Sequence, residues 1–290
     1  MSRVDIAIGG VTFAAESADL ELAPRADYAG FGGDGSATGE TVHVHVQRGP
    51  GAEAGVAPLL FRSDQAWSLT RCVGAYRMWS GGGGPLGPHW DARWAPGMHE
   101  VVLYAGVAGA GPVPNPIAYP LDQLLLMYYL ATRRGLILHG AGAVLGGRSF
   151  VFAGRSGAGK TTLARQFQSE ARLQLLSDDR IVVRGRPGRY EAFGTPWPGE
   201  ARVARSARAP LGGIFFITHG LENRVRPLPA SFIADRLLPV CSILWFDRWV
   251  LPEMLDFCDE LIRSVPFYEF ECRPMQDAAA FFLDFAGARL

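Results

Sequence analysis

The chain has 290 residues, of which 48% are hydrophobic and 19% charged, and its formal net charge is zero. This composition is typical of a globular protein with a sizeable core and excludes a disordered one. The balanced charge offers no bulk attraction to nucleic acid or to an anionic membrane, so neither is expected as a partner. The four cysteines, Cys72, Cys241, Cys258 and Cys272, have no metal-binding spacing and are expected to be free thiols, in part buried.

The chain start, MSRVDIAIGG, has no basic segment followed by an apolar run, so it does not resemble a secretory signal. The longest apolar stretches, such as Leu121–Leu130, are interrupted and too short to cross a bilayer. These two features predict a cytoplasmic protein.

Lysine usage is the most informative feature of the composition. Lysine and arginine together number 28, yet Lys160 is the single lysine. The arginine bias, with high alanine and glycine, indicates a GC-rich bacterial genome. A compact ammonium on a flexible stem fits between phosphate oxygens where a planar guanidinium does not. The one retained lysine therefore points to a phosphate site.

Residues 1–118 are expected to form a β-rich N-terminal domain. Short strand patterns separated by glycine run through it, and they lie at Val4–Ile8, Val11–Phe13, Thr41–Gln47, Ala66–Ser68, Ala75–Trp79 and Glu100–Ala105. Gly9-Gly10 predicts a hairpin turn, and the proline-rich link Pro112–Pro116 predicts the end of the domain. Its tryptophans are expected mainly in the core, with a contact surface as the alternative.

From residue 119 on, helical patterns alternate with strand patterns, so residues 119–290 are expected to form an α/β domain. Helices are expected at Leu121–Arg133, Thr161–Leu173, Ser231–Val240, Leu251–Ser264 and Met275–Phe285. Strands are expected at Leu136–Leu145, Ser149–Ala153, Leu173–Leu176, Ile181–Arg184, Tyr190–Phe193, Gly213–Thr218 and Phe267–Cys272. The fold class of the whole chain is therefore α/β, preceded by a β-rich domain.

A phosphate-binding loop is the strongest motif in the chain. The segment Gly154-Arg155-Ser156-Gly157-Ala158-Gly159-Lys160-Thr161 matches G-x-x-x-x-G-K-[ST]. Glycines let successive backbone N–H groups point at phosphate oxygens, and the following helix presents its positive end to the same anion. Lys160 is expected to reach the β- and γ-phosphates, and the Thr161 hydroxyl to ligate Mg²⁺.

Two further features accompany this loop. Ser177-Asp178-Asp179 follows an apolar run, and an acidic residue at such a strand end holds Mg²⁺ in proteins that bind nucleotides this way. One aspartate can serve the metal while the other accepts the proton of a hydroxyl. His139 ends the apolar strand upstream, whereas His219 is expected in a turn with no role.

The order of His139-Gly140, the loop and Asp178-Asp179 resembles the catalytic domain of HPr kinase/phosphorylase. The stretches LILHGAGAVLGGRSFVFAGRSGAGKTTLA, LLSDDRIVV and FGTPWPGE look closest to HPr-kinase-like proteins of peptide-tailoring clusters, including lasso peptide kinases. The resemblance covers roughly Pro120–Leu290. It implies a P-loop fold of the HPr kinase/phosphoenolpyruvate carboxykinase-like type, with ATP as phosphate donor and Mg²⁺ as cofactor.

The resemblance also implies roles for single residues. Asp178 is the candidate general base, with His139 and Lys160 as further catalytic residues, and the two aspartates could be exchanged. Nucleotide binding falls to Gly154–Thr161 and to Thr162, which stands where HPr kinases usually carry a glutamate. Thr161, Asp179 and Glu200 are the candidate metal ligands. Arg202, Arg205 and Arg208 are open candidates for stabilising the transferred phosphate.

The predicted function is transfer of the terminal phosphate to a hydroxyl, first of all a serine or threonine of a peptide or protein. A free small molecule such as an amino acid is the second choice of acceptor. A nucleotide-dependent switch or scaffold with little transfer activity is the alternative of another class. No NKxD motif for guanine is present, but ATP and GTP both stay open as donors. A homo-oligomer and a reverse phosphorylase activity stay open as well.

Overall fold

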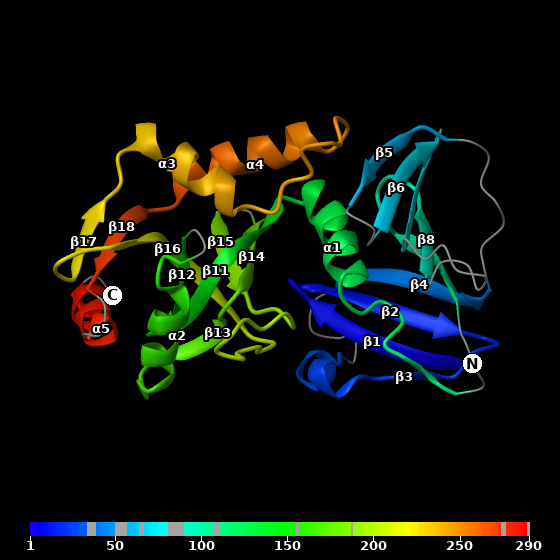
Figure 1. Cartoon of the computed structure of the whole chain (residues 1–290), viewed down its shortest axis with the longest axis horizontal. Helices are drawn as coiled ribbons and strands as arrows, with labels where there is room; N and C mark the ends of the chain where they lie inside the picture. The colour runs from blue at the N-terminus through cyan, green and yellow to red at the C-terminus, as the bar shows by residue number, and fades with distance from the viewer. Residues whose placement is uncertain are drawn as a thin grey trace. The chain divides into compact units, whose positions relative to one another are not determined.

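A computed structural model describes residues 1–33, 39–49, 57–63, 67–72, 74–80, 90–106, 111–154, 157–186, 188–273 and 277–288. The chain forms two compact units (Figure 1). Unit 1 comprises Met1–Tyr129 together with Trp245–Arg248, and unit 2 comprises Leu130–Leu244 together with Trp249–Leu290. The sequence-based boundary at 118/119 lies before helix α1 (Leu121–Ala131), whose residues up to Tyr129 belong to unit 1.

Unit 1 is built on one eight-stranded sheet with the order β1-β2-β4-β9-β8-β7-β6-β5. The strands are β1 Ser2–Ile8, β2 Val11–Ser17, β4 Thr41–Arg48, β5 Leu59–Arg62, β6 Trp67–Cys72, β7 Ala75–Ser80, β8 Trp90–Trp94 and β9 Glu100–Ala105. Strand β4 is parallel to both β2 and β9, and the other neighbours are antiparallel. Valines of β4 are buried while His43 and His45 are exposed, so alternation sets one face toward the core.

The remainder of unit 1 covers this sheet. It contains the 3₁₀ helix η1 (Ala26–Phe31) and the parallel pair β3 (Leu22–Ala23) and β10 (Val113–Pro114). Tyr128 of α1 packs against Tyr76 and Trp94, with ring centroids 4.9 and 5.3 Å apart. The buried Asp247 accepts a hydrogen bond of 2.9 Å from the Tyr128 hydroxyl, which ties the segment Trp245–Arg248 to unit 1.

The described part of unit 2 contains eight strands, and two long ones, β11 and β16, change their pairing partners along their length. They are β11 Gly135–Leu145, β12 Arg148–Ala153, β13 Gln174–Ser177, β14 Arg180–Arg186, β15 Arg189–Phe193, β16 Arg208–His219, β17 Arg224–Pro227 and β18 Phe267–Cys272. The first half of β11 pairs with β14, and its second half pairs with β12 and β13. Strand β16 likewise pairs with β15 near its start and then runs parallel to β12 and β18. Residues 154, 179 and 219 thereby lie at or next to strand ends. His139 does not end its strand, as the sequence suggested, but lies within β11 where the pairing changes from β14 to β12.

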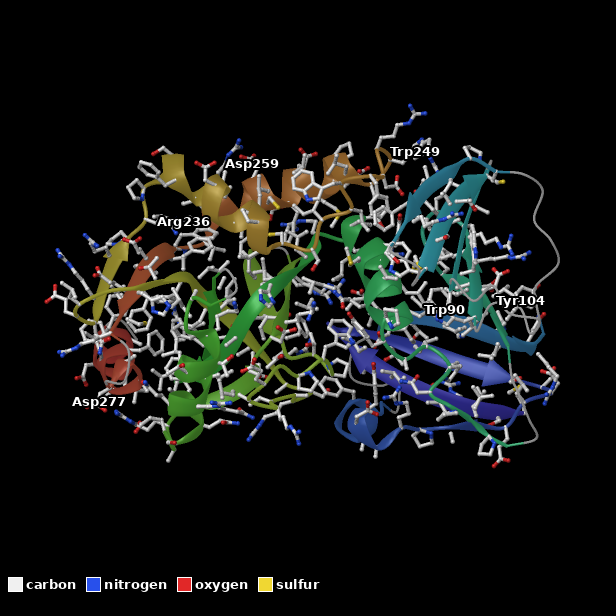
Figure 2. The ribbon with its side chains drawn as sticks, in the orientation of Figure 1. Trp90, Tyr104, Arg236, Trp249, Asp259 and Asp277 are labelled. Carbon is white, nitrogen blue, oxygen red and sulfur yellow. The ribbon has the colours of Figure 1, made fainter. Side chains whose placement is uncertain are left out.

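The helices of unit 2 are α2 (Lys160–Gln168), α3 (Ala230–Leu237), the 3₁₀ helix η2 (Leu238–Val240), α4 (Leu251–Ser264) and α5 (Ala278–Gly287). Helices α2 and α5 bury their apolar sides against β11, β12 and β16 in a core rich in phenylalanine. Phe282 of α5, for example, meets Phe152 and Phe150 edge-on at 4.9 and 5.3 Å. The outer side of α4 carries Asp259 and Arg263, which form an ion pair of 2.7 Å (Figure 2).

These elements confirm the predicted mixed α/β architecture with large sheets. Helix α4 and strand β18 have the predicted bounds, and Gly9-Gly10 forms the predicted hairpin turn; Gly146-Gly147 forms a second one between β11 and β12. Helix α2 is shorter than predicted, because tight turns at Ser169 and Glu170 end it before Leu173 enters the core. No helix in the described part of the chain is long and apolar enough to cross a membrane.

Candidate functional site

The predicted phosphate-binding loop joins strand β12 to helix α2, in the predicted order of strand, loop and helix. Gly157 and Gly159 have φ angles of +82° and +94°, which residues other than glycine rarely adopt. Nζ of Lys160 donates a hydrogen bond of 2.7 Å to the carbonyl oxygen of Gly154, so the ammonium folds over the loop. Burial lowers the pKa of Lys160, and the nearby charge of Asp179 partly opposes this shift. Arg155 and Ser156 lie outside the described residues.

A cavity of about 390 Å³, here called the phosphate cavity, lies beside this loop within unit 2. It gathers residues that are far apart in the sequence, namely His139, Gly157, Gly159, Lys160, Thr161, Thr162, Asp178, Asp179, Gly199 and Glu200. Apart from the three open arginine candidates, every described candidate residue lies at this cavity except Gly154 and Ala158, which belong to the loop itself. None of Arg202, Arg205 and Arg208 is among its lining residues.

Asp179 and His139 form a pair at the cavity. Strand β11 pairs with β14 so that His139 stands opposite Arg180, and the N–H of Gly140 donates to the carbonyl of Asp179. Nδ1 of His139 lies 3.2 Å from Oδ1 of Asp179, while Arg180 contacts Oδ2. Burial acts to raise the pKa of Asp179, but the hydrogen bond from His139 and the surrounding positive charges outweigh it and lower the pKa. This carboxylate is therefore held ionised beside the phosphate loop.

Asp178 has a different environment although it is the adjacent residue. Its Oδ1 accepts hydrogen bonds from the backbone N–H groups of Gly199 and Val203 at 2.9 and 3.0 Å. Its Oδ2 accepts one from the N–H of Ala201 at 2.7 Å, and the side chain is 4% exposed. The loop after Trp197 thus wraps around one carboxylate. All three of these bonds come from the backbone, whereas the oxygens of Asp179 contact the side chains of His139 and Arg180.

The segment GTPWPGE supplies this loop. Trp197 is buried at 5% exposure. A side chain at Gly199 would force its neighbours to shift, because a Cβ atom there would lie 2.9 Å from Oδ2 of Asp178 and 3.1 Å from Cβ of Asp179. Glu200 is exposed and lines the cavity.

The predicted metal ligands can be compared with what Mg²⁺ requires. Thr161, Asp179 and Glu200 line the same cavity and present only oxygen atoms, which suits a hard cation that also takes phosphate oxygens as ligands. Among the residues with described coordinates, no group of three or more histidine, cysteine, aspartate or glutamate side chains could by itself hold a metal. The residues present therefore fit a magnesium ion carried in with a nucleotide.

His219 is a residue of the site that the sequence did not predict. It is the last residue of β16 and not part of a turn, and its Nε2 lies 2.7 Å from the carbonyl oxygen of Gly157. Strand β16 runs parallel to β12, so both strands end at the same edge and His219 arrives beside the loop. Only this pairing, which the sequence did not reveal, could have identified it.

Comparisons with known proteins add the following. No curated protein matches the chain in sequence. A solved structure described as the Hpr(Ser) kinase/phosphatase from Coxiella burnetii is similar over 53% of this chain and 89% of its own, with 12% identity and a TM-score of 0.30. A family model described as "SynChlorMet cassette protein ScmC" matches residues 120–272, slightly more than half of the chain. This family is defined by its cassette and is not specific to lasso peptides. By this match, the chain belongs to the ScmC family of SynChlorMet cassette proteins.

Proposed function

We propose that this protein is a kinase that binds a nucleoside triphosphate with Mg²⁺ at Gly154–Thr161 and transfers the terminal phosphate to a hydroxyl. One observation carries the proposal: a cavity of about 390 Å³ is lined at once by the glycine-containing loop, by the single lysine of the chain and by an ionised aspartate paired with histidine. The likeness to HPr kinases in the sequence motifs supports the same reaction. ATP is the first choice of donor, and the location of the protein is proposed to be the cytoplasm.

The chemistry follows from the positions of the groups. Lys160, released from Gly154, and the amides of the loop neutralise the charge of the phosphate chain. Bound Mg²⁺ would supply further positive charge, with Thr161 and Glu200 as its protein ligands and Asp179 as a third if it does not receive the acceptor proton. The acceptor oxygen forms a bond to the terminal phosphorus while the bond to the bridging oxygen breaks, so a nucleoside diphosphate leaves. Most of the acceleration comes from positioning and electrostatics.

Asp179 is proposed as the group that receives the acceptor proton, which is the exchange of roles that the sequence left open. Both aspartates line the cavity, but Asp179 is 22% exposed and its oxygens contact the side chains of His139 and Arg180, whereas Asp178 is 4% exposed and accepts three backbone hydrogen bonds. Asp178 is proposed to shape the loop that carries Glu200. If Asp179 receives the proton, Glu200 and Thr161 are left as the main metal ligands.

Nucleotide binding is tested with the lone lysine. In Lys160→Ala the charge-assisted contacts to phosphate are lost, which costs about 1.5–3 kcal/mol and corresponds to about a 10- to 150-fold rise in Kd for Mg·ATP. Isothermal titration calorimetry measures it, with Arg172→Ala as a control because Arg172 is 67% exposed in the same unit. Absence of any heat or thermal shift with Mg·ATP and Mg·GTP for the unaltered chain would refute the proposal.

The acceptor is tested by following phosphate. The chain is incubated with labelled ATP and, in separate reactions, with peptides containing serine or threonine, with free amino acids, and with no acceptor. Label on a peptide hydroxyl supports the first choice, and label on a free amino acid supports the small-molecule alternative. Slow release of phosphate that no hydroxyl compound changes would favour the switch or scaffold.

A further inference from the structure

A second cavity, of about 740 Å³, lies in unit 2 at the opposite end of strand β12 from the phosphate loop. Arg148 starts β12 and lines this cavity, whereas Ala153 ends the strand at the loop. Six strand residues at about 3.3 Å each separate the two ends by roughly 20 Å. The second cavity is thus a separate place on the same unit, and no part of the phosphate site lines it.

Four arginines line this cavity, Arg134, Arg148, Arg186 and Arg189, and no acidic residue is among the residues that line it. Two of the arginines have carboxylate partners: Arg134 forms an ion pair with Glu260, and Arg189 lies 3.7 Å from Glu191. Arg148 is exposed and has no acidic side chain within ion-pair distance in the described part of the chain. Four guanidinium groups line this concave site and no carboxylate is among its lining residues, and such a site attracts anions.

The chemistry of the lining selects anionic groups of a certain kind. Guanidinium groups form paired hydrogen bonds with carboxylate and phosphate oxygens, so several of them in one cavity suit a ligand with more than one such group. Tyr190 and Ser264 also line the cavity. Because the arginines come from different turns and strands, a single monovalent anion does not engage them all.

The surrounding backbone argues for a compact ligand and against an extended peptide. At the cavity, Arg189 and Tyr190 of β15 pair only with β14, and Arg148 of β12 pairs only with β11. The rest of each strand is paired on both sides, so the unpaired stretches of one or two residues are too short for a peptide strand to add. The volume of about 740 Å³ lies in the range of about 300–1,000 Å³ that is typical of small-molecule sites.

We propose that this arginine cavity binds a compact small molecule that carries two or more phosphate or carboxylate groups. The inference does not rest on the proposed kinase activity, because it uses none of the residues of the phosphate cavity. Binding is expected to weaken as salt rises, since the arginines are near the surface and screened.

The test uses the full chain carrying Lys160→Ala, so that the phosphate loop contributes less to the measured binding of the anionic probes. Citrate and pyrophosphate are titrated by calorimetry as probes of the carboxylate and the phosphate source. The same titrations are repeated after adding Arg148→Glu with Arg189→Glu, both at exposed side chains. The matched control adds Arg172→Glu with Arg224→Glu, which changes the net charge equally at exposed side chains outside the cavity.

At least one of the two probes is expected to bind saturably, with one molecule per chain. The probe that binds more tightly shows whether the natural ligand carries phosphate or carboxylate groups. Charge reversal at Arg148 and Arg189 is expected to raise its Kd by at least about tenfold, and the control pair by less than about threefold. Absence of saturable heat for both probes, or equal weakening by the control pair, overturns the proposal. A tetraglutamate peptide that binds more tightly than either probe overturns the compact class of ligand.

Discussion

Replacing Asp178 by asparagine separates a structural carboxylate from a catalytic one. The Asp178 carboxylate accepts three backbone hydrogen bonds, from Gly199, Ala201 and Val203. An asparagine can keep the two bonds on one oxygen, but its NH₂ group then faces the N–H of Ala201. Loss of a charge-assisted bond, with a buried donor left unpaired, costs about 2–4 kcal/mol. In a protein of this size the Tm falls by roughly 2–4 °C per kcal/mol, so a drop of about 5–15 °C is expected.

Asp179→Asn is the matched variant at the adjacent residue. Its side chain is 22% exposed and contacts His139 and Arg180 at the cavity, so the cost in stability is about 1 kcal/mol or less. Thermal unfolding followed by circular dichroism measures both variants, and phosphate transfer measures the catalytic role. Asp179→Asn is expected to retain nucleotide binding and to lower transfer by about 10²- to 10⁴-fold.

The reasoning fails if the two variants behave in the opposite way. An Asp178→Asn protein with an unchanged Tm and lost transfer would identify Asp178 as the base, as the sequence first suggested. An Asp179→Asn protein with full transfer would remove the proposed role of the pair with His139.

Three further outcomes follow from the geometry of unit 2 and the cysteines. His219→Ala removes one hydrogen bond to the carbonyl of Gly157, and such a bond contributes about 0.5–1.5 kcal/mol. The Kd of Mg·ATP measured by calorimetry is therefore expected to rise by about 2- to 10-fold, and a lower Kd would contradict this. Gly199→Ala is expected to destabilise unit 2 in thermal unfolding, whereas Gly287→Ala, which meets no atom within 4 Å, is neutral or mildly stabilising; equal Tm values would count against the close approach. Burial raises the pKa of Cys272 to about 12, so at pH 8 roughly one molecule in 10,000 carries the thiolate, and mass spectrometry is expected to find iodoacetamide on the exposed Cys72 first.

Much of the architecture follows from local patterns. The hairpin glycines, the strict alternation of β4 and the amphipathic pattern of α4 determine these elements through contacts between residues close in sequence. The strands β5, β8 and β17 were missed; β8 lies between β9 and β7, whereas β5 and β17 lie at sheet edges. Strand β17 carries two arginines and a proline in four residues, and it is held by pairing with β18, where Arg226 contacts Glu269 and Glu271 at 3.5 and 3.1 Å. A pattern of single residues does not reveal a strand that depends on such partners.

The sequence by itself determined the phosphate loop as a motif, since its glycines and single lysine act within eight consecutive residues. It also named both aspartates, but it could not distinguish their environments, because adjacent side chains leave the chain in different directions. Only the tertiary structure decided that the loop at 199–203 caps Asp178 and leaves Asp179 to His139. The same applies to His219 and to the arginine cavity, which exist only where distant strand ends and turns meet.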